Sequence, residues 1–434
     1  MKTKLLNLFF IVTLSLIVSV GCSYENNTSS NDNNDEVVNE DINLEDSKAA
    51  DLMGSVEKSE IDTSENLNVE NTTKLTDFGV NLLKNSKGEG ENVLISPVSV
   101  LYALGMTQNG ADGETLQEME EVMGISSSEL NGYLNAYLTT LPNDENNKFI
   151  LANSIWLNEE ANFVPNEEFL KTNKDYYDAS IFEAPFNEET VSLINSWVNE
   201  NTQGMIEKLV NELPKESIMV LINALSLDAK WDIPYTTEQI SEDEFTKEDG
   251  EVQNVESMNA DLYNYIEGDS EIGLKKDYMD SKYSFVALLP NEDLTIDDYV
   301  ENLSGEKIQN LLTNVEEVGV ETSIPKFKVE YSNSLVKPLT DLGLNKGFSE
   351  SEADFNKMGE SEENIYIGDV IHKTFIEVDE VGTKAGAVTG VVLETAAAPI
   401  EKKVVYLNRP FVYMIIDNEN NHPIFLGTIK EIEK

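Results

Sequence analysis

Residues 380–395 read E-V-G-T-K-A-G-A-V-T-G-V-V-L-E-T, and charged residues are confined to one of the two alternating sets of positions from Thr383 onward. Counted from Thr383, every second residue is uncharged and none is proline, whereas the intervening set holds Lys384 and Glu394. Such alternation predicts a strand with one uncharged face, although its many Gly and Ala residues are poor strand formers. The stretch is therefore either an ordinary exposed loop or edge strand, or a segment able to be a loop in one state and a strand in another. The uncharged set is Thr383, Ala385, Ala387, Thr389, Val391 and Leu393.

The sequence on both sides of this stretch favours strands. Two apolar runs follow it, at 411–416 and 424–429, and the polar residues between them predict a buried hairpin. The other expected strands are Phe149–Leu157, Ser284–Leu289, Ile365–Ile367 and Phe375–Val378.

Helices are expected earlier in the chain. Apolar residues between 75 and 83 fall on one helical face. Ser96 and Pro97 predict a helix start, because serine caps free amides and proline suits the first helical position. The nearly apolar run at 98–106 predicts a buried helix that ends at Asn109-Gly110. Early helices followed by later strands predict an α+β fold with a large sheet.

The first 21 residues are typical of a secretory signal. Lys2 and Lys4 precede an apolar run at 5–20, which is shorter than the roughly 20 residues of a transmembrane helix. Cys22, the only cysteine, follows Gly21 and resembles the lipid-modified cysteine of bacterial lipoproteins. We expect a protein that is lipid-anchored at the extracellular face of the membrane; the alternative is a plainly secreted chain.

Residues 22–70 are expected to be a disordered acidic tether. From residue 23 they contain 14 acidic and two basic residues, with Tyr24 as the only aromatic. Low hydrophobicity with high charge cannot offset the entropy of ordering. We therefore place the folded domain at 71–434.

The net charge of −51 excludes several classes of partner. Nucleic acid recognition needs clustered Lys and Arg, so we expect no nucleic-acid partner and membrane contact only through the lipid anchor. Gly-x-Ser-x-Gly, His-Glu-x-x-His and Gly-x-x-x-x-Gly-Lys-Ser/Thr motifs are absent from the sequence. Only two histidines exist, and His372 lacks the context of a catalytic base, which favours a core histidine. We therefore predict no enzyme, no metal and no cofactor.

An ordered series of motifs from about Thr72 to Ile429 resembles the serpin family of serine protease inhibitors. One such match would be weak, but the series in this order is specific. The motifs are N-V-L-I-S-P-V-S at 92–99, A-L-G-M at 103–106, N-S-I-W-L at 153–157, I-N-S-W-V at 194–198, L-I-N-A at 221–224 with Trp231, I-P-K-F at 324–327, A-D-F at 353–355, H-K-T-F-I-E-V-D-E at 372–380 and N-R-P-F at 408–411.

The resemblance implies the serpin fold, with three β-sheets, about nine helices and an exposed reactive-centre loop. A target protease cleaves the loop, and the freed part inserts into the main sheet as a new strand, which drags and distorts the acyl-linked enzyme. It also implies a sheet-opening region at Trp231 and His372, and a hinge in which Gly382 permits the change in dihedral angles. The implied hinge residues are Glu380, Gly382, Thr383, Ala385, Ala387 and Thr389.

The bond that the protease cleaves is placed less sharply. The family's usual spacing from Glu380 predicts cleavage between Ala396 and Ala397, with Thr395 and Ala398 as neighbouring candidates, whereas counting back from Asn408 leads to Pro399. These small residues favour an elastase-like serine protease with a shallow pocket. We expect a monomer.

Two other classes of function stay open at this point. A non-inhibitory serpin acting as a binding module usually has bulky, charged or proline residues at the inward hinge positions, and this sequence has none there. A lipid-anchored solute-binding protein would show two lobes of repeated βα units, and the sequence shows no such repeat.

Overall fold

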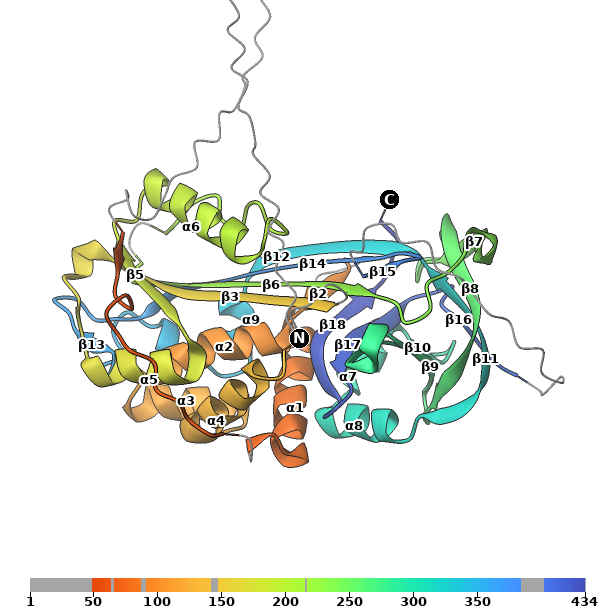
Figure 1. Ribbon diagram of the computed structural model, residues 1–434, viewed down its shortest axis with the longest axis horizontal. Coiled ribbons are helices and arrows are strands. Elements are labelled where there is room, and N and C mark those ends of the chain that lie inside the picture. Colours follow the sequence, from red (N-terminus) through yellow and green to blue (C-terminus); the bar gives the residue numbers. More distant parts are fainter. Residues whose placement is uncertain are drawn as a thin grey trace, which may run out of the picture. The chain divides into compact units, whose positions relative to one another are not determined.

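The computed structural model describes residues 49–63, 66–86, 91–141, 147–214, 217–383 and 402–433. These residues form three β-sheets and nine α-helices, which confirms the predicted α+β fold (Figure 1). The helices are α1 (Val69–Ser86), α2 (Pro97–Gln108), α3 (Gly113–Met123), α4 (Ser127–Leu138), α5 (Glu167–Tyr177), α6 (Glu188–Asn201), α7 (Ile296–Glu301), α8 (Gly305–Thr313) and α9 (Val336–Asp341).

A seven-stranded sheet contains the stretch that begins at Gly382 and therefore positions the candidate site. Helix α6 covers one face of this sheet and α1 to α5 lie on the other side (Figure 1). In order across the sheet, its strands are β1 (Ala50–Asp51), β5 (Ser180–Ala184), β3 (Asn147–Asn158), β6 (Met219–Lys230), β15 (Gly382–Thr383), β14 (Ile367–Val378) and β12 (Phe327–Ser334).

A nine-stranded sheet supports it from below and at one end. The predicted C-terminal hairpin is confirmed as the adjacent strands β17 and β18, which lie near one end of this sheet. In order across the sheet, its strands are β16 (Lys403–Tyr406), β11 (Glu316–Pro325), β8 (Val252–Glu267), β9 (Glu271–Asp277), β10 (Tyr283–Pro290), β17 (Phe411–Asp417), β18 (His422–Ile429) and β2 (Val93–Ile95). Strand β7 (Ile240–Thr246) also pairs with β8. The third sheet consists of β13 (Gly359–Glu360) and β4 (Val164–Pro165).

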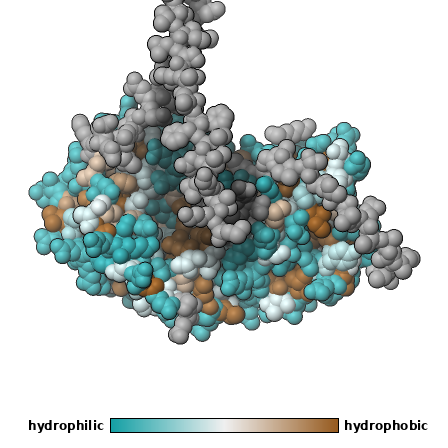
Figure 2. All heavy atoms as spheres, in the orientation of Figure 1, coloured by the Kyte–Doolittle hydropathy of each residue, from teal (hydrophilic) through white to brown (hydrophobic). Residues whose placement is uncertain are grey.

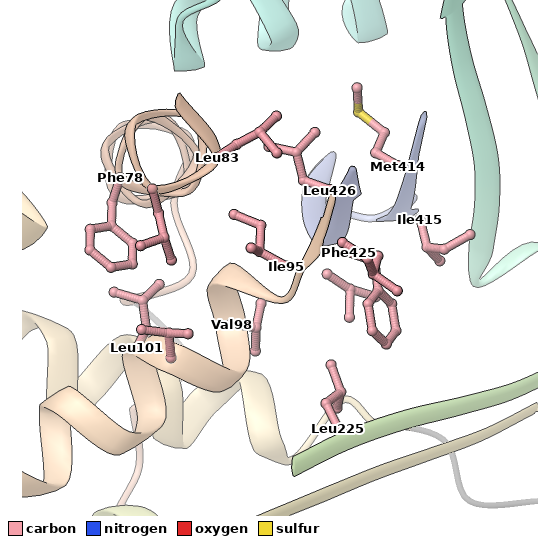
Figure 3. Close-up of a cluster of buried hydrophobic side chains, with 14 of the residues drawn as sticks. Phe78, Leu83, Ile95, Val98, Leu101, Leu225, Met414, Ile415, Phe425 and Leu426 are labelled. Atoms are coloured by element: carbon pink, nitrogen blue, oxygen red, sulfur yellow. The ribbon is translucent and has the colours of Figure 1, made fainter. Parts of the chain in front are cut away.

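The start of α2 follows from local chemistry. The Ser96 side chain accepts a hydrogen bond from the Ser99 amide at 3.2 Å, and Pro97 is the first helical residue. Every residue of this helix is buried, as its apolar sequence predicts. Figure 3 shows the result: Val98 of α2 packs with Ile95, Phe425 and Leu225, so the helix joins the two large sheets in one core.

The visible surface is mainly polar, with scattered apolar side chains (Figure 2). Among the described residues no helix has the length and apolar character needed to cross a membrane. No described group of three or more His, Cys, Asp or Glu side chains is arranged to hold a metal ion.

Two expectations from the sequence need correction. The ordered fold begins before residue 71, because Ala50 and Asp51 pair with β5 and Met53 is only 4% exposed. Residues 22–48 of the predicted tether, like the signal segment, lie outside the described residues. The expected short strand at Ile365–Ile367 is wrong, because the strand starts at Ile367 and continues without a break to Val378. The middle of this strand carries polar residues on its partly exposed face, so a search for apolar runs does not detect it.

Candidate functional site

A seam between strands β6 and β14 divides the seven-stranded sheet. The two strands pair directly in parallel from Ile367 opposite Met219 to Thr374 opposite Leu225. Beyond this paired part β15 lies between them, with Thr383 opposite Ala229 of β6 and Val378 of β14. The seam is therefore closed along most of its length and is occupied at one end by the first residues of the 380–395 stretch.

Gly382 is required at this end for reasons of space. A Cβ atom there would lie 2.1 Å from the carbonyl oxygen of Ala229 and 2.8 Å from the Cα of Lys230. The Asp379 carboxylate accepts hydrogen bonds from the amides of Val381 (2.8 Å) and Gly382 (3.0 Å). Gly382 is not among the residues with positive φ, so in this state close approach to β6, and not an unusual dihedral angle, demands glycine.

Thr383, the first inward residue of the sequence pattern, is already seated in the sheet. It is only 1% exposed, and its hydroxyl oxygen lies 2.5 Å from the phenol oxygen of Tyr278. The Tyr278 ring stacks on Trp231, with ring centroids 4.5 Å apart and an interplanar angle of 6°. Burial raises the pKa of Tyr278 far above its usual value, so the phenol keeps its proton. Tyr278 and Trp231 thus form a niche for Thr383 that offers one hydroxyl partner and is otherwise aromatic.

Trp231 ties this niche to the turn that precedes Gly382. Its indole nitrogen donates to the Asp379 carbonyl at 2.8 Å, and its backbone amide donates to the Val381 carbonyl at 2.9 Å. The Tyr235 amide donates to the Glu380 carbonyl at 2.9 Å. The predicted sheet-opening tryptophan therefore contacts two backbone carbonyls of this turn, and Tyr235 contacts a third.

Glu380 anchors the outer side of the same turn. Its carboxylate lies 2.9 Å from the Lys326 ammonium group, which is also 3.5 Å from Glu256. The hydrogen bond to Lys326 lowers the pKa of Glu380. Because these side chains are partly exposed, the pair orients the turn more than it stabilises the fold.

A buried lysine lies beneath Trp231. Lys276 is 6% exposed, and its ammonium group lies 5.2 Å from the ring centroid of Trp231 and 4.6 Å from that of Tyr235. It donates to the Ile233 carbonyl at 2.9 Å and forms no ion pair with a described carboxylate. Burial lowers the pKa of Lys276 to about 8. This cation is held by aromatic faces and one carbonyl, a costly environment for a charge.

His372 lies in the closed part of the seam, opposite Asn223. The Ser96 amide donates to His372 Nε2 at 3.1 Å, so the ring proton is on Nδ1, which donates to Asn223 Oδ1 at 2.5 Å. Burial lowers the pKa of His372 to about 3. The amide of Asn223 in turn donates to Asn153 Oδ1 at 2.7 Å and to the Ser99 carbonyl. A neutral hydrogen-bonded network therefore joins the two strands that an inserted strand would separate.

The structure brings together the predicted hinge start and the predicted sheet-opening tryptophan, while His372 lies further along the seam. The rest of the predicted loop, including Ala385, Ala387, Thr389 and the cleavage candidates Thr395–Ala398, lies outside the described residues, as does Cys22. The chain returns at β16, and Arg409 donates to the Pro290 carbonyl at 2.6 Å. Sequence reasoning assigned no role to Tyr278 or Lys276, because both lie in β9 or just after it, without a motif of their own.

Comparison with known proteins gives one consistent family. Residues 73–432 match the family described as Serpin (serine protease inhibitor). The chain is 29% identical over 375 residues to intracellular coagulation inhibitor 2 of Tachypleus tridentatus, covering 83% of this chain and 90% of that protein.

Three solved structures share this fold. The native state of tengpin, a thermophilic serpin, aligns with a TM-score of 0.85 and 45% identity, covering 88% of this chain and 100% of that one, whereas latent tengpin aligns with a TM-score of 0.73. Thyroxine-binding globulin in complex with thyroxine shares the fold, with a TM-score of 0.74 and 22% identity over 84% of this chain and 100% of that one.

Proposed function

This chain belongs to the serpin family, and from that membership we propose that it inhibits serine proteases as a single-use substrate, by cleavage of residues 384–401 and insertion of the freed strand into the seam between β6 and β14. The protein is then consumed by each target molecule and is not an enzyme. The observation that carries the proposal is the position of Gly382 and Thr383, which already occupy the end of that seam.

The sequence beyond Thr383 supports continued insertion. The inward positions as far as Leu393 are uncharged, and burying a charge there without a partner would cost several kcal/mol. The alternative is a non-inhibitory binding module, and a protein with this fold, thyroxine-binding globulin, is known in complex with thyroxine. The inward residues of this chain give that alternative no specific support.

We further propose an elastase-like target. The candidate residues Thr395, Ala396 and Ala397 have small side chains that fit a shallow pocket. The chain contains one arginine, Arg409, which follows β16 and donates a hydrogen bond to the Pro290 carbonyl. The loop thus offers an arginine-specific protease no residue to bind.

The leader and the acidic segment support a proposal for location. Lys2, Lys4 and the apolar run precede Cys22, which would carry the lipid at the extracellular face of the membrane; release as a plain secreted protein is the alternative. Residues 23–48 would separate the domain from that surface, since like charges extend a chain.

Incubation with an elastase followed by denaturing electrophoresis tests the proposed activity. An inhibitor of this type should form an adduct that survives denaturant, because the protease serine stays esterified to the loop. The same elastase with its catalytic serine replaced by alanine is the control and should give no adduct. Cleavage of the loop at every ratio of the two proteins, with full protease activity remaining, would contradict the proposal.

A further inference from the structure

Exposed apolar side chains gather on three adjacent strands of the nine-stranded sheet, β8, β11 and β16 (Figure 1). These strands carry five of the eight large hydrophobic side chains that are exposed among the described residues. Single exposed hydrophobic residues are ordinary on a protein surface, whereas a group on neighbouring strands favours a surface that a partner covers. The five are Val252 and Tyr263 of β8, Val318 of β11, and Val404 and Tyr406 of β16.

The register of the strands places most of this group on one face. Glu321 of β11 is directly opposite Val404 on one side and Asp261 on the other. Tyr406 and Tyr263 each lie two positions from one of these partners, and side chains two apart on a strand share a face. The Tyr406 hydroxyl donates to the Glu321 carboxylate, as expected of side chains on one face. We call these five exposed residues the β8–β11–β16 face. The alternate positions are buried, and they are Val320, Thr322 and Val405.

The same face is acidic. Asp261 and Glu321 are directly opposite each other, an arrangement that destabilises a sheet when the charges are alike. Asp243 of β7 adds a third carboxylate beside them, since it accepts a hydrogen bond from the Ser323 hydroxyl at 3.1 Å. Lys402 lies 2.5 Å from Asp261, whereas Glu321 and Asp243 have hydroxyl groups as side-chain partners among the described residues. The sheet therefore retains opposed carboxylates that one lysine only partly neutralises.

A polar hollow opens between these carboxylates. Its volume is about 450 Å³, within the range of sites that take a small group, and Asp243, Asp261 and Glu321 all line it. Asn259, Tyr406 and Asn408 supply the other polar groups of its wall. The hydrogen bond to Asp261 raises the pKa of Lys402, and the charge of Glu321 adds to this effect. Both observations indicate a site that favours a cationic side chain brought by a partner.

Chain length places the target protease beside this face. Lys402 is six positions after Ala396, so the proposed cleavage bond lies at most about 21 Å from Lys402, at about 3.5 Å per residue. A protease of about 240 residues has a radius of about 23 Å. An enzyme bound at that bond is therefore wide enough to reach the strands that Lys402 contacts through Asp261.

We propose that the β8–β11–β16 face is a second docking surface for the target protease and selects enzymes that present basic and apolar side chains beside their active site. The inference rests on the proposed function, and it adds a determinant of target choice outside the cleaved bond. Basic groups of the enzyme would neutralise Asp261 and Glu321, and apolar groups would cover Tyr263 and Val404. Because charge complementarity acts on the encounter of two proteins, it should raise the association rate and leave the number of inhibitor molecules consumed per protease unchanged.

The rate at which the full-length protein inhibits a basic elastase tests the charged part. Asp261→Asn combined with Glu321→Gln should lower this rate about three- to tenfold at low salt, and added salt should shrink the difference because it screens the charges. Glu159→Gln combined with Glu160→Gln is the matched control. It removes the same two charges at exposed positions after β3 and should leave the rate unchanged. An elastase of acidic net charge should not respond to either double substitution.

The apolar part has its own variants. Tyr263→Thr combined with Val404→Thr keeps two good strand formers and removes the apolar contact. The rate should fall at low and at high salt alike, because salt does not screen that contact. Val164→Thr is the control, since Val164 is also an exposed strand valine but lies in β4. Resistance to chemical denaturant, measured for every variant, separates docking from damage. Neutralising the opposed carboxylates should leave that resistance equal or higher, although association becomes slower.

The outcomes distinguish this proposal from the proposed function. Equal rates at low salt for wild type and the Asp261→Asn, Glu321→Gln protein, with the covalent adduct still formed, overturn the docking surface and leave inhibition intact. Failure of the wild type to form any adduct overturns the proposed function itself. Sedimentation measures a third outcome. Wild-type dimers that Tyr263→Thr dissociates, with an unchanged inhibition rate, would assign the face to a second copy of this chain and also overturn the proposal.

Discussion

The hydroxyl oxygen of Thr383 lies 2.5 Å from the phenol oxygen of Tyr278, and both side chains are buried, with the Tyr278 ring stacked on Trp231. The first inward residue of the loop thus already forms the contact from which a longer strand would grow. Because Thr383 is already paired with both β6 and β14, a strand inserted as proposed would start in the correct register.

Thr383→Arg should turn the inhibitor into a substrate. The niche holds one hydroxyl partner, so a guanidinium group would be desolvated without a counter-charge, at several kcal/mol. Insertion must outrun hydrolysis of the acyl-enzyme, and each ~1.4 kcal/mol added to its barrier slows it about tenfold. The stoichiometry of inhibition measures the effect. Thr383→Val, which removes only the hydroxyl, is the matched control and should retain most inhibition; equal stoichiometry for Thr383→Arg and wild type would contradict the insertion mechanism.

Ala396→Arg should redirect the inhibitor toward trypsin-like proteases. An arginine at the cleaved bond supplies the cation that their deep acidic pocket binds, whereas a shallow pocket rejects it. Association rates with a trypsin and an elastase should change in opposite directions. The same substitution at Ala398 is the comparison, and a larger switch there would move the cleaved bond to that position.

The N-terminal segment should divide into a dispensable and a stabilising part. Deleting 23–48 should leave the free energy of unfolding unchanged, while deletion to residue 66 should lower it by about 2–4 kcal/mol, because Met53 is buried and Thr63 donates to Asn135 at 2.7 Å. Met53→Ala in the full chain should reproduce a loss of about 2 kcal/mol, and Ser55→Ala, at an exposed position, should not. Chemical denaturation measures all four, and equal stability of the two deletions would show that residues 49–66 do not hold the fold.

Lys276→Met should stabilise the protein at pH 7. Desolvation lowers the pKa of Lys276 to about 8, from 10.5, although Asp232 and Asp277 oppose the shift. The native state therefore binds fewer protons than the unfolded state between pH 8 and 10.5, so this lysine costs stability below pH 8 and the cost disappears as the pH rises to 10.5.

The expected gain is about 1–3 kcal/mol at pH 7, because the lost cation–π contacts offset part of a desolvation cost of roughly 3 kcal/mol. The gain should shrink steadily above pH 8. Lys337→Met is the control, since that side chain is 82% exposed and should show no such pH dependence. A gain that is constant with pH would mean that the charge of Lys276 is not what destabilises the fold.

The sequence predicts those parts of the fold whose signal is local. The hairpin of β17 and β18 follows from two apolar runs and the polar residues between them, and the start of α2 follows from Ser96 and Pro97. β1 is invisible in the sequence because Ala50 and Asp51 lie in an acidic stretch and gain order only from the edge of β5. For the site, Trp231 and Gly382 carry recognisable motifs. Tyr278 does not, because its partner Thr383 is 105 positions away and no local pattern specifies that contact.

The pairing of β2 with β18 has a consequence for the order of events during synthesis. Val93 lies opposite Thr428, and β14 supplies the parallel partner of β6 from far along the chain. An emerging chain can form helices α1 to α5 early, but the seven-stranded sheet must wait for residue 383, and the nine-stranded sheet cannot close until residue 429 has left the ribosome. Contacts of such long sequence separation fold slowly and leave unpaired strand edges exposed meanwhile. The nascent chain should therefore depend on chaperones until its final hairpin is complete, and a product stopped before residue 411 should aggregate and not form a smaller stable domain.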